Sequence, residues 1–324
     1  MGVVRTVLGD IAPESLGVCQ THEHIICDQR MAPFANIIDK ARSVKKTYMI
    51  LTDEERAIEE LQKYGEAGGD AVVDVTTHGW GRNPEAMARI SRESGVHIVA
   101  TGGFYTEPHI PTFAEEKSVS DLVRWIVSEF EDGVGDTGIK IGLLKSGIYH
   151  GRIENLERKC LRAVARASLE TGLSITTHTS GARRYEVPGG NLGKYHLEVL
   201  LEEGVSPTSL INGHVDERPD LGYLSELCDM GCYIQFDVIG KEHWLLDETR
   251  VDLLKELISR GYLTHILMGT DRCRQHELYR EMGGKGYTHL LDSFVPLMKE
   301  GGIATGDIEV MLKENPARAL TVQV

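Results

Sequence analysis

Several features that would place this chain in a familiar class are missing from its sequence. No run of about 18 uninterrupted apolar residues occurs, so no membrane-spanning helix is predicted. The six cysteines are scattered without a Cys-X-X-Cys pair, which is typical of reduced and mostly buried thiols. The formal net charge of −14 argues against a general role in binding nucleic acid. The N-terminus lacks the apolar core of a signal peptide, so we expect a cytoplasmic protein that binds neither nucleic acid nor membrane.

The sequence also lacks the marks of a divided or disordered chain. Of its 324 residues, 41% are hydrophobic and 26% are charged, as in ordinary soluble globular proteins. No Pro/Ser-rich linker or low-complexity segment separates one part from another. The glycine-rich Gly-X-Gly-X-X-Gly turn of dinucleotide-binding open sheets does not follow the first apolar segment. We therefore predict a single domain over residues 1–324.

What the sequence does contain is an alternation of short apolar segments and helical stretches. Nearly continuous apolar runs are typical of parallel strands that helices cover. Eight such units in about 300 residues predict an α/β protein with a closed (β/α)8 barrel, known as a TIM barrel, and a doubly wound open sheet is the alternative. The eight strands are predicted at residues 17–25, 71–79, 97–105, 139–147, 173–179, 210–216, 232–240 and 265–271.

Local signals place some of the intervening segments. Asn83 followed by Pro84 predicts the start of one helix, and Ser120 is the predicted N-cap of the helix over residues 122–130. Residues 28–52 form the longest insertion, and we expect it to lie over the face that carries the active site.

The triplet His22-Glu23-His24 closes the first predicted strand. Side chains alternate along a strand, so His22 and His24 aim at one point and Glu23 points away. Two convergent imidazoles are half of a metal site. The alternative is a pair of ordinary core or surface histidines.

Polar residues end four other predicted strands. Barrels of this kind place their active sites at the carboxyl ends of the strands. Lys145, His178, His214 and Asp271 stand at those ends on the fourth, fifth, sixth and eighth strands. A lysine suits a metal site only if its neutral amine captures carbon dioxide, because the resulting carbamate is a carboxylate that can bridge two divalent ions. The alternative for Lys145 is an ordinary salt bridge.

Taken together, these residues resemble the signature of the amidohydrolase superfamily, and more narrowly that of the phosphotriesterase family with its phosphotriesterase-like lactonases. The resemblance covers nearly the whole chain. The supporting stretches are residues 17–24, 81–83, 100–105, 137–145, 176–179, 213–214, 235–241 and 314–317.

This resemblance implies a binuclear metal centre and a homodimer. Nitrogen and oxygen ligands suit zinc, manganese, cobalt, nickel and iron, and zinc is the first expectation among them. The implied ligands are His22, His24 and Asp271 for the more buried metal, His178 and His214 for the more exposed metal, and carboxylated Lys145 with a hydroxide bridging both.

Such a centre would lower the pKa of its bridging water and polarise a carbonyl or phosphoryl oxygen of the substrate. Asp271 would take the hydroxide proton and pass it towards the leaving oxygen. We therefore expect a metal-dependent hydrolase of a lactone or related carboxylic ester, with promiscuous phosphotriesterase activity. A dedicated phosphotriesterase or an amide hydrolase is the enzymatic alternative. A non-catalytic small-molecule-binding barrel is the alternative from another class.

Three further residues are candidates for substrate binding. Tyr105 ends the third strand and matches a tyrosine that contacts the substrate in the lactonases, although a simple rim aromatic is the alternative. Lys241 and Arg274 match a lysine and an arginine that hold phosphate in relatives acting on phosphorylated sugar lactones. Glu277 replaces the tyrosine that completes that pocket, and Arg272 lies in the same loop as Arg274. A phosphorylated or otherwise anionic sugar lactone is therefore one candidate substrate.

Overall fold

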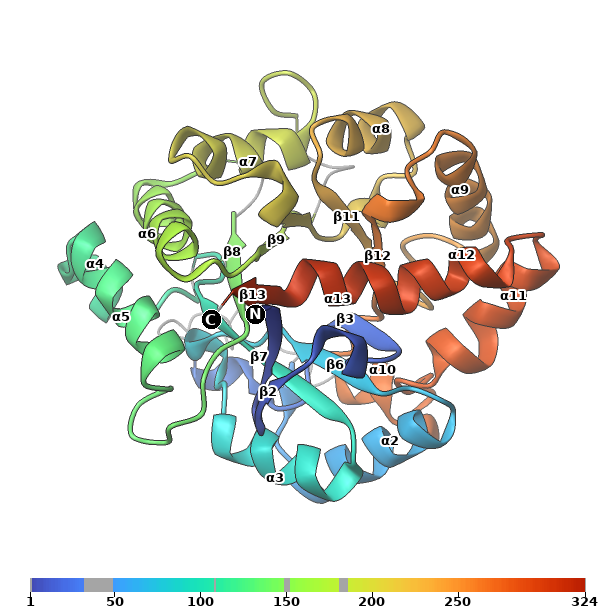
Figure 1. Ribbon diagram of the computed structural model, residues 1–324, viewed down its shortest axis with the longest axis horizontal. Coiled ribbons are helices and arrows are strands. Elements are labelled where there is room, and N and C mark those ends of the chain that lie inside the picture. The colour runs from blue at the N-terminus through green and yellow to red at the C-terminus, as the bar shows by residue number, and fades with distance from the viewer. Residues whose placement is uncertain (1, 32–48, 108, 149–151, 181–185, 324) are drawn as a thin grey trace.

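The computed structural model describes residues 2–31, 49–107, 109–148, 152–180 and 186–323. Within them, eight strands form one parallel sheet that curls into a nearly closed barrel surrounded by helices, in a single domain (Figure 1). The predicted fold class is therefore confirmed. In their order across the sheet, the strands are β3 (Cys19–Glu23), β6 (Ala71–Asp74), β7 (His97–Gly103), β8 (Leu143–Gly147), β9 (Ile175–His178), β10 (Leu210–Asn212), β11 (Tyr233–Phe236) and β12 (Ile266–Met268).

Each of these strands lies inside its predicted range but is shorter. The difference is greatest at the carboxyl ends, where the polar residues expected in the strand follow it instead. β10, for example, ends at Asn212, whereas its predicted range extended to residue 216. The backbone turns into the mouth of the barrel at this point, so the ladder of strand hydrogen bonds stops before the polar residues begin.

The two edges of the sheet meet through β3 and β12. The backbone N–H of Asp271 donates to the carbonyl of His22 at 3.0 Å. The buried carboxylate of Glu23, which points away from the barrel mouth as predicted, accepts from the N–H groups of Thr270 at 2.6 Å and Arg272 at 3.0 Å. Glu23 therefore holds the residues on both sides of Asp271.

An outer layer of helices covers the sheet. Asn83 caps one helix by accepting from the N–H of Ala86, and Pro84 follows it, as predicted. The prediction of Ser120 as an N-cap is wrong, because Ser118 caps that helix through a reciprocal box with Asp121. The main helices of this layer are α2 (Glu54–Glu66), α3 (Pro84–Ser94), α5 (Val119–Glu131), α6 (Asn155–Thr171), α7 (Leu192–Glu202), α8 (Leu221–Asp229) and α9 (Asp247–Ser259).

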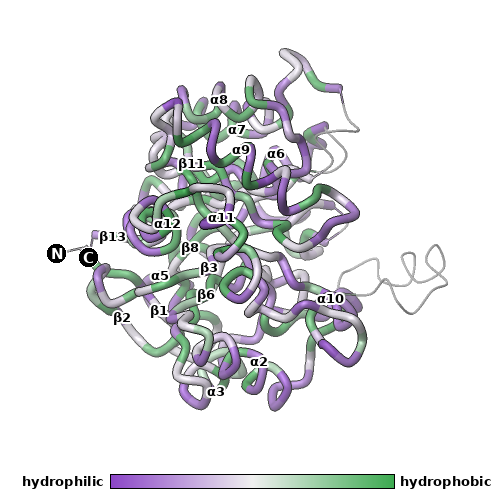
Figure 2. Tube along the Cα trace, turned by 90° about the vertical axis from the view of Figure 1, so that its right-hand side faces the viewer, coloured by the Kyte–Doolittle hydropathy of each residue, from purple (hydrophilic) through white to green (hydrophobic). Residues whose placement is uncertain are grey.

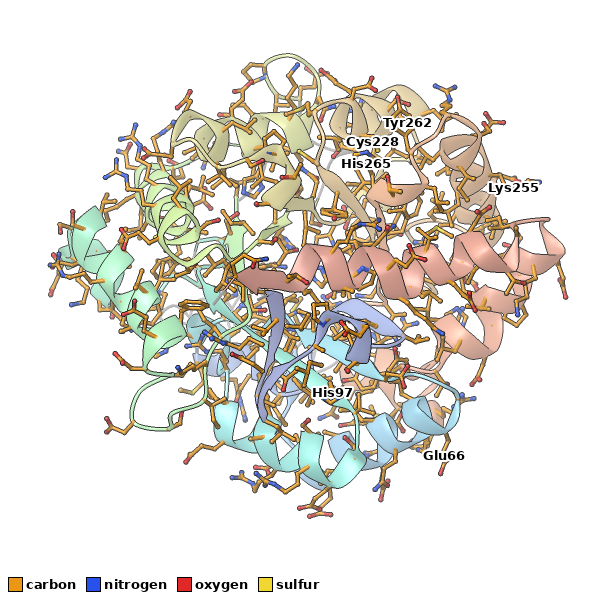
Figure 3. All side chains as sticks on the ribbon, in the orientation of Figure 1. Glu66, His97, Cys228, Lys255, Tyr262 and His265 are labelled. Atoms are coloured by element: carbon orange, nitrogen blue, oxygen red, sulfur yellow. The ribbon has the colours of Figure 1, made fainter. Side chains whose placement is uncertain are left out.

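The amino-terminal end of the barrel is closed by a small antiparallel sheet that the sequence did not predict and by the helical end of the chain. A small antiparallel sheet of β1 (Gly2–Thr6), β2 (Gly9–Ile11) and β13 (Thr321–Gln323) lies there with α13 (Asn315–Leu320), which follows α11 (Val295–Glu300) and α12 (Thr305–Glu309). Figure 2 shows both chain ends on this side and α10 (Gln275–Leu278) on the opposite side. His97, which is labelled in Figure 3, is the first residue of β7 and therefore marks the amino-terminal end of a barrel strand. The opposite side therefore carries the carboxyl ends of the strands.

The long insertion is described only at its two ends. β4 (Cys27–Asp28) pairs antiparallel with β5 (Ile50–Leu51). Residues 32–48 lie outside the described part of the chain, so the prediction that they cover the active face remains a prediction. No helix among the described residues is both long and apolar enough to cross a membrane.

A fully buried arginine fixes the segment that follows β11. Arg250, on α9, donates to Asp216 Oδ2 at 2.7 Å, to Asp247 Oδ1 at 2.9 Å and to the carbonyl of Val238 at 2.8 Å. Burial raises the pKa of Asp216 to about 6, even though the charge of Arg250 opposes this shift. The arginine therefore compensates a buried carboxylate and anchors a segment of the barrel mouth at the same time.

Replacing Arg250 by methionine should lower the free energy of unfolding by about 3 to 5 kcal/mol, because it leaves the Asp216 carboxylate buried without its cation. Urea denaturation followed by circular dichroism measures this change. Lys255→Met is the matched control, since Lys255 lies on the same helix and is exposed (Figure 3). Equal midpoints for the two variants would contradict a stabilising role for Arg250.

Candidate metal centre

The predicted site residues come together in one cavity of about 100 Å³ at the carboxyl ends of the strands. His22 belongs to β3, Lys145 to β8 and His178 to β9, so the strands place these side chains directly. His24, Tyr105, His214 and Asp271 lie one to three residues beyond a strand end, whereas Lys241 and Arg274 lie further along the segments that follow β11 and β12. The cavity is lined by all nine predicted site residues: His22, His24, Tyr105, Lys145, His178, His214, Lys241, Asp271 and Arg274.

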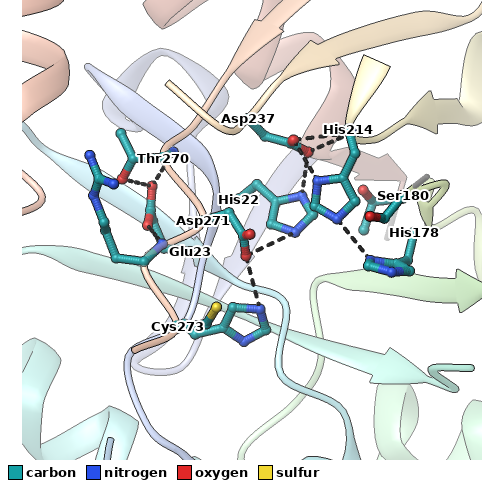
Figure 4. A network of polar contacts seen from close by, with 12 residues as sticks. His22, Glu23, His178, Ser180, His214, Asp237, Thr270, Asp271 and Cys273 are labelled. Carbon is teal, nitrogen blue, oxygen red and sulfur yellow. Dashed lines mark hydrogen bonds and ion pairs between the residues drawn. The ribbon is translucent and has the colours of Figure 1, made fainter. Parts of the chain in front are cut away.

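The donor atoms form two adjoining groups, drawn in Figure 4. In the first group, Asp271 Oδ1 lies 3.4 Å from His24 Nε2 and 3.9 Å from His22 Nε2. These three residues can each offer one ligand atom within 4.8 Å of the others. In the second group, His214 Nε2 lies 2.8 Å from His178 Nδ1. Lys145 Nζ lies 3.3 Å from His22 Nε2.

Three of the imidazoles are oriented by partners on their far side. Thr76 Oγ1 lies 2.7 Å from His24 Nδ1. Asp237 reaches two rings at once, with Oδ2 2.8 Å from His22 Nδ1 and Oδ1 2.7 Å from His214 Nδ1. Metal-binding histidines commonly use one ring nitrogen for the metal and the other for such a partner. The residues present therefore fit a metal centre that uses the Nε2 atoms of these three histidines.

Asp237 was not predicted as a site residue. It is close enough to His22 and His214 to form a third possible ligand group. Both of its oxygen atoms, however, are engaged with Nδ1 atoms and with the N–H of His214 at 3.1 Å. We therefore assign it to orienting these histidines. The position of Asp237 directly after β11 was a sequence signal for a residue at the barrel mouth. Its contacts could not be predicted, because its partners His22 and His214 are distant in the sequence.

Replacing Asp237 by asparagine should weaken metal binding by about 10- to 100-fold, since the amide cannot accept from both imidazoles with the strength of a carboxylate. Competition with a fluorescent chelator measures the affinity. Asp252→Asn, an exposed change on α9, is the control. Unchanged affinity in Asp237→Asn would exclude the orienting role.

Two of the candidate ligands have an uncommon backbone conformation. Among the described residues, His214 with φ 57° and Asp271 with φ 46° are the non-glycine residues at positive φ. This left-handed region is unfavourable for residues with a Cβ atom and persists where the surrounding structure imposes it, often at functional sites. His214 lies two residues beyond the end of β10 and Asp271 lies three residues beyond the end of β12, and both side chains line the cavity.

Burial and neighbouring charges shift the pKa values of the candidate ligands. Burial lowers the pKa of Lys145 to about 8, although Asp237 and Asp271 act in the opposite direction. Burial would also lower the pKa of His214, but the charge and hydrogen bond of Asp237 raise it to about 9. Burial would raise the pKa of Asp271, yet Lys241 and His24 hold it well below its usual range. The site therefore contains an ionised carboxylate and a lysine amine that is readily deprotonated.

The candidate substrate-binding residues lie on two sides of these ligands. The Tyr105 hydroxyl is 2.9 Å from His178 Nε2, and its ring packs against Trp80 at 4.6 Å between centroids. Lys241 Nζ donates to Asp271 Oδ2 at 2.7 Å. Arg272 does not line the cavity, because its buried side chain donates to backbone carbonyls such as that of Ile239 at 3.1 Å.

An eight-stranded parallel barrel with titratable side chains gathered at the carboxyl ends of its strands is the architecture of a barrel enzyme. The sequence matches the model of the phosphotriesterase family over residues 2–320, and the chain belongs to this family. The predicted resemblance is therefore confirmed, and the chain is a hydrolase of this family.

Individual relatives cover almost the whole chain. The phosphotriesterase homology protein of Escherichia coli (strain K12) is 32% identical over 303 residues, which are 93% of this chain and 97% of that protein. Its crystal structure, complexed with phosphate in the active site, has a TM-score of 0.84. The N-acetyltaurine hydrolase of Danio rerio is 31% identical, with 99% of this chain and 98% of that protein covered. A lactonase from Listeria monocytogenes is 29% identical, with a TM-score of 0.87 and coverage of 99% and 100%.

Proposed function

We propose that this protein is a binuclear metal-dependent hydrolase that cleaves a lactone or a related carboxylic ester bearing an anionic group. The observation that carries this proposal is the pair of adjoining donor groups, His22–His24–Asp271 and His178–His214, with buried Lys145 beside them. A single metal would leave one of these groups without a role. Phosphotriester hydrolysis is proposed as a side activity of the same site.

In this proposal, Lys145 acts as a carbamate. The ammonium first loses one proton. The neutral amine then attacks carbon dioxide, a C–N bond forms, and a second proton is released, so that a cation becomes a carboxylate. A pKa of about 8 makes the neutral amine accessible near neutral pH. The side chain is 1% exposed and lies beside His22, where an uncompensated ammonium is unfavourable. The carbamate would add carboxylate oxygens to the nitrogen and oxygen atoms that the neighbouring histidines and Asp271 would offer to metal.

Two bound divalent ions would supply a water molecule of lowered pKa and polarisation of the scissile carbonyl. The protein's own side chains supply positioning and proton transfer. Asp271, kept ionised by Lys241, can take up a proton and release it to the leaving oxygen. Tyr105 and Trp80 line the cavity on the other side and limit the size and orientation of the acyl group.

The proposal is tested with protein loaded with zinc or manganese in the presence of bicarbonate. Hydrolysis of anionic and neutral γ-lactones, p-nitrophenyl esters, N-acyl amides and paraoxon is measured on one preparation. Lactones or esters should give the highest kcat/KM. A higher value for N-acyl amides would favour the second candidate, an amide hydrolase, which the N-acetyltaurine hydrolase relatives suggest. Two bound metals without turnover of any substrate would favour a binding protein.

A further inference from the structure

A buried carboxylate lies behind the two cations of the cavity. Glu277 Oε1 accepts from Arg274 Nη1 at 2.8 Å, and its Oε2 lies 3.5 Å from Lys241 Nζ. The Glu277 side chain is only 9% exposed and does not line the cavity, whereas Lys241 and Arg274 do. The carboxylate is therefore separated from the substrate space by these two cations and by Cys273, which also lines the cavity.

We call the part of the cavity lined by Lys241 and Arg274 the Lys241–Arg274 corner. Its charges can be counted from the contacts of these two residues. Lys241 and Arg274 together contribute two positive charges. Lys241 also contacts Asp271, but that carboxylate is assigned to a metal in the proposed function. Glu277 therefore remains as the carboxylate dedicated to the cation pair, and the corner presents about one net positive charge to a ligand.

Glu277 is ionised in this setting. Burial alone would raise its pKa, but Lys241 and Arg274 outweigh burial and lower it. Cys273 Sγ, 3.6 Å from Oε2, is the third group in contact with the carboxylate. Its thiol carries no compensating charge, because burial raises the pKa of Cys273 well above its usual value. The negative charge of Glu277 is therefore a permanent part of this corner.

We propose that Glu277 makes the Lys241–Arg274 corner selective for a substrate bearing a monoanionic group, a carboxylate or a sulfonate, over one bearing a phosphate dianion. This inference rests on the proposed function and specifies its substrate class. A phosphate monoester carries between about 1.5 and 2 negative charges at neutral pH. One net positive charge leaves part of that charge uncompensated in a buried site, which is unfavourable. The single negative charge of a monoanion is fully compensated by the one net positive charge of the corner.

The test uses three γ-lactones with the same ring and a terminal phosphate, sulfonate or hydroxyl group, at pH 8, where the phosphate is a dianion. The wild-type protein should give the highest kcat/KM with the sulfonate. In Glu277→Gln, the ratio of kcat/KM for phosphate to that for sulfonate should rise about tenfold, since one opposing charge is removed. Glu277→Asp, which keeps the charge, should retain the wild-type order.

Glu242→Gln is the matched control. Glu242 is 56% exposed and paired with Lys285, so its neutralisation changes the net charge equally without touching the corner. Its ratio should equal that of the wild type. A Glu277→Gln ratio equal to that of this control, or a wild-type preference for phosphate, would overturn the inference while leaving the proposed hydrolase intact.

Absence of turnover would instead count against the proposed function, and the inference is then tested by binding. Tetrahydrofuran analogues that carry the same three substituents have no scissile bond, and calorimetry measures their Kd on metal-loaded protein. In Glu277→Gln, the ratio of Kd for the phosphate analogue to Kd for the sulfonate analogue should fall about tenfold. An unchanged ratio of Kd values would refute the role of Glu277.

Discussion

Asp271→Asn is expected to lower kcat by about 10²- to 10⁴-fold, which is the range found when a general acid–base group is removed. Asparagine has nearly the same volume and can still offer an oxygen to a metal. It cannot hold a proton at neutral pH, and it leaves Lys241 without the carboxylate oxygen at 2.7 Å. The variant therefore removes proton transfer while preserving the shape of the cavity.

The measurement must separate lost metal from lost proton transfer. Metal content is determined by elemental analysis, and kcat is compared at two metal equivalents per chain. Asp252→Asn, which changes an exposed carboxylate on α9, should keep wild-type turnover. A fully metallated Asp271→Asn protein with wild-type kcat would remove this residue from the proton-transfer step.

The barrel was predictable because its signals are local. Each strand is a short apolar run, and each run had to be covered by the helix that follows it. Several strand ends were predicted too far along the chain because the predicted strands were extended to include polar residues such as His214 and Asp271, which lie beyond the ends of β10 and β12. Their left-handed backbone is imposed by the packing at the barrel mouth. The unpredicted β1, β2 and β13 are three- to five-residue strands that depend on each other across the length of the chain.

The candidate site was predictable in its residues but not in its relationships. Histidines, a lysine and an aspartate at strand ends must converge once the barrel closes. The contacts between individual side chains of the site could not be predicted from the sequence. Asp237 orients two imidazoles from β3 and from the segment after β10, and Glu277 offsets one of the two positive charges of Lys241 and Arg274, which lie in different loops. Both relationships depend on rotamers and register across the barrel.

Three carboxylates, those of Asp237, Asp271 and Glu277, give different parts of the cavity different electrostatic roles. Asp237 strengthens the imidazoles that would hold metal, Asp271 stands between that group and Lys241, and Glu277 lies behind Lys241 and Arg274. Only Asp271 among the three lines the cavity. The other two act through the side chains that they contact, so their substitution should change metal affinity or selectivity before it changes the chemical step.

Lys145→Met should abolish stable binding of the second metal and reduce metal affinity by more than the roughly 100-fold typical of a lost orienting partner. Methionine fills the same buried space without a nitrogen for carbon dioxide, so the change removes the proposed carbamate and little else. Lys145→Glu restores a carboxylate on the same strand and should recover part of the metal content. Elemental analysis after dialysis in bicarbonate measures both variants against Lys313→Met, an exposed control.

The wild-type protein supplies the complementary test of Lys145. Native mass spectrometry of the metal-loaded chain should detect the added mass of one carbon dioxide, and chelation of the metals at acidic pH should remove it, because the free carbamate loses carbon dioxide when protonated. If Lys145→Met bound two metals with wild-type affinity, or if the metallated chain lacked the added mass, the lysine would be an ordinary buried amine. The two donor groups would then have to hold their metals without a bridge, and His22, which contacts both Lys145 and Asp237, would remain as a link between them.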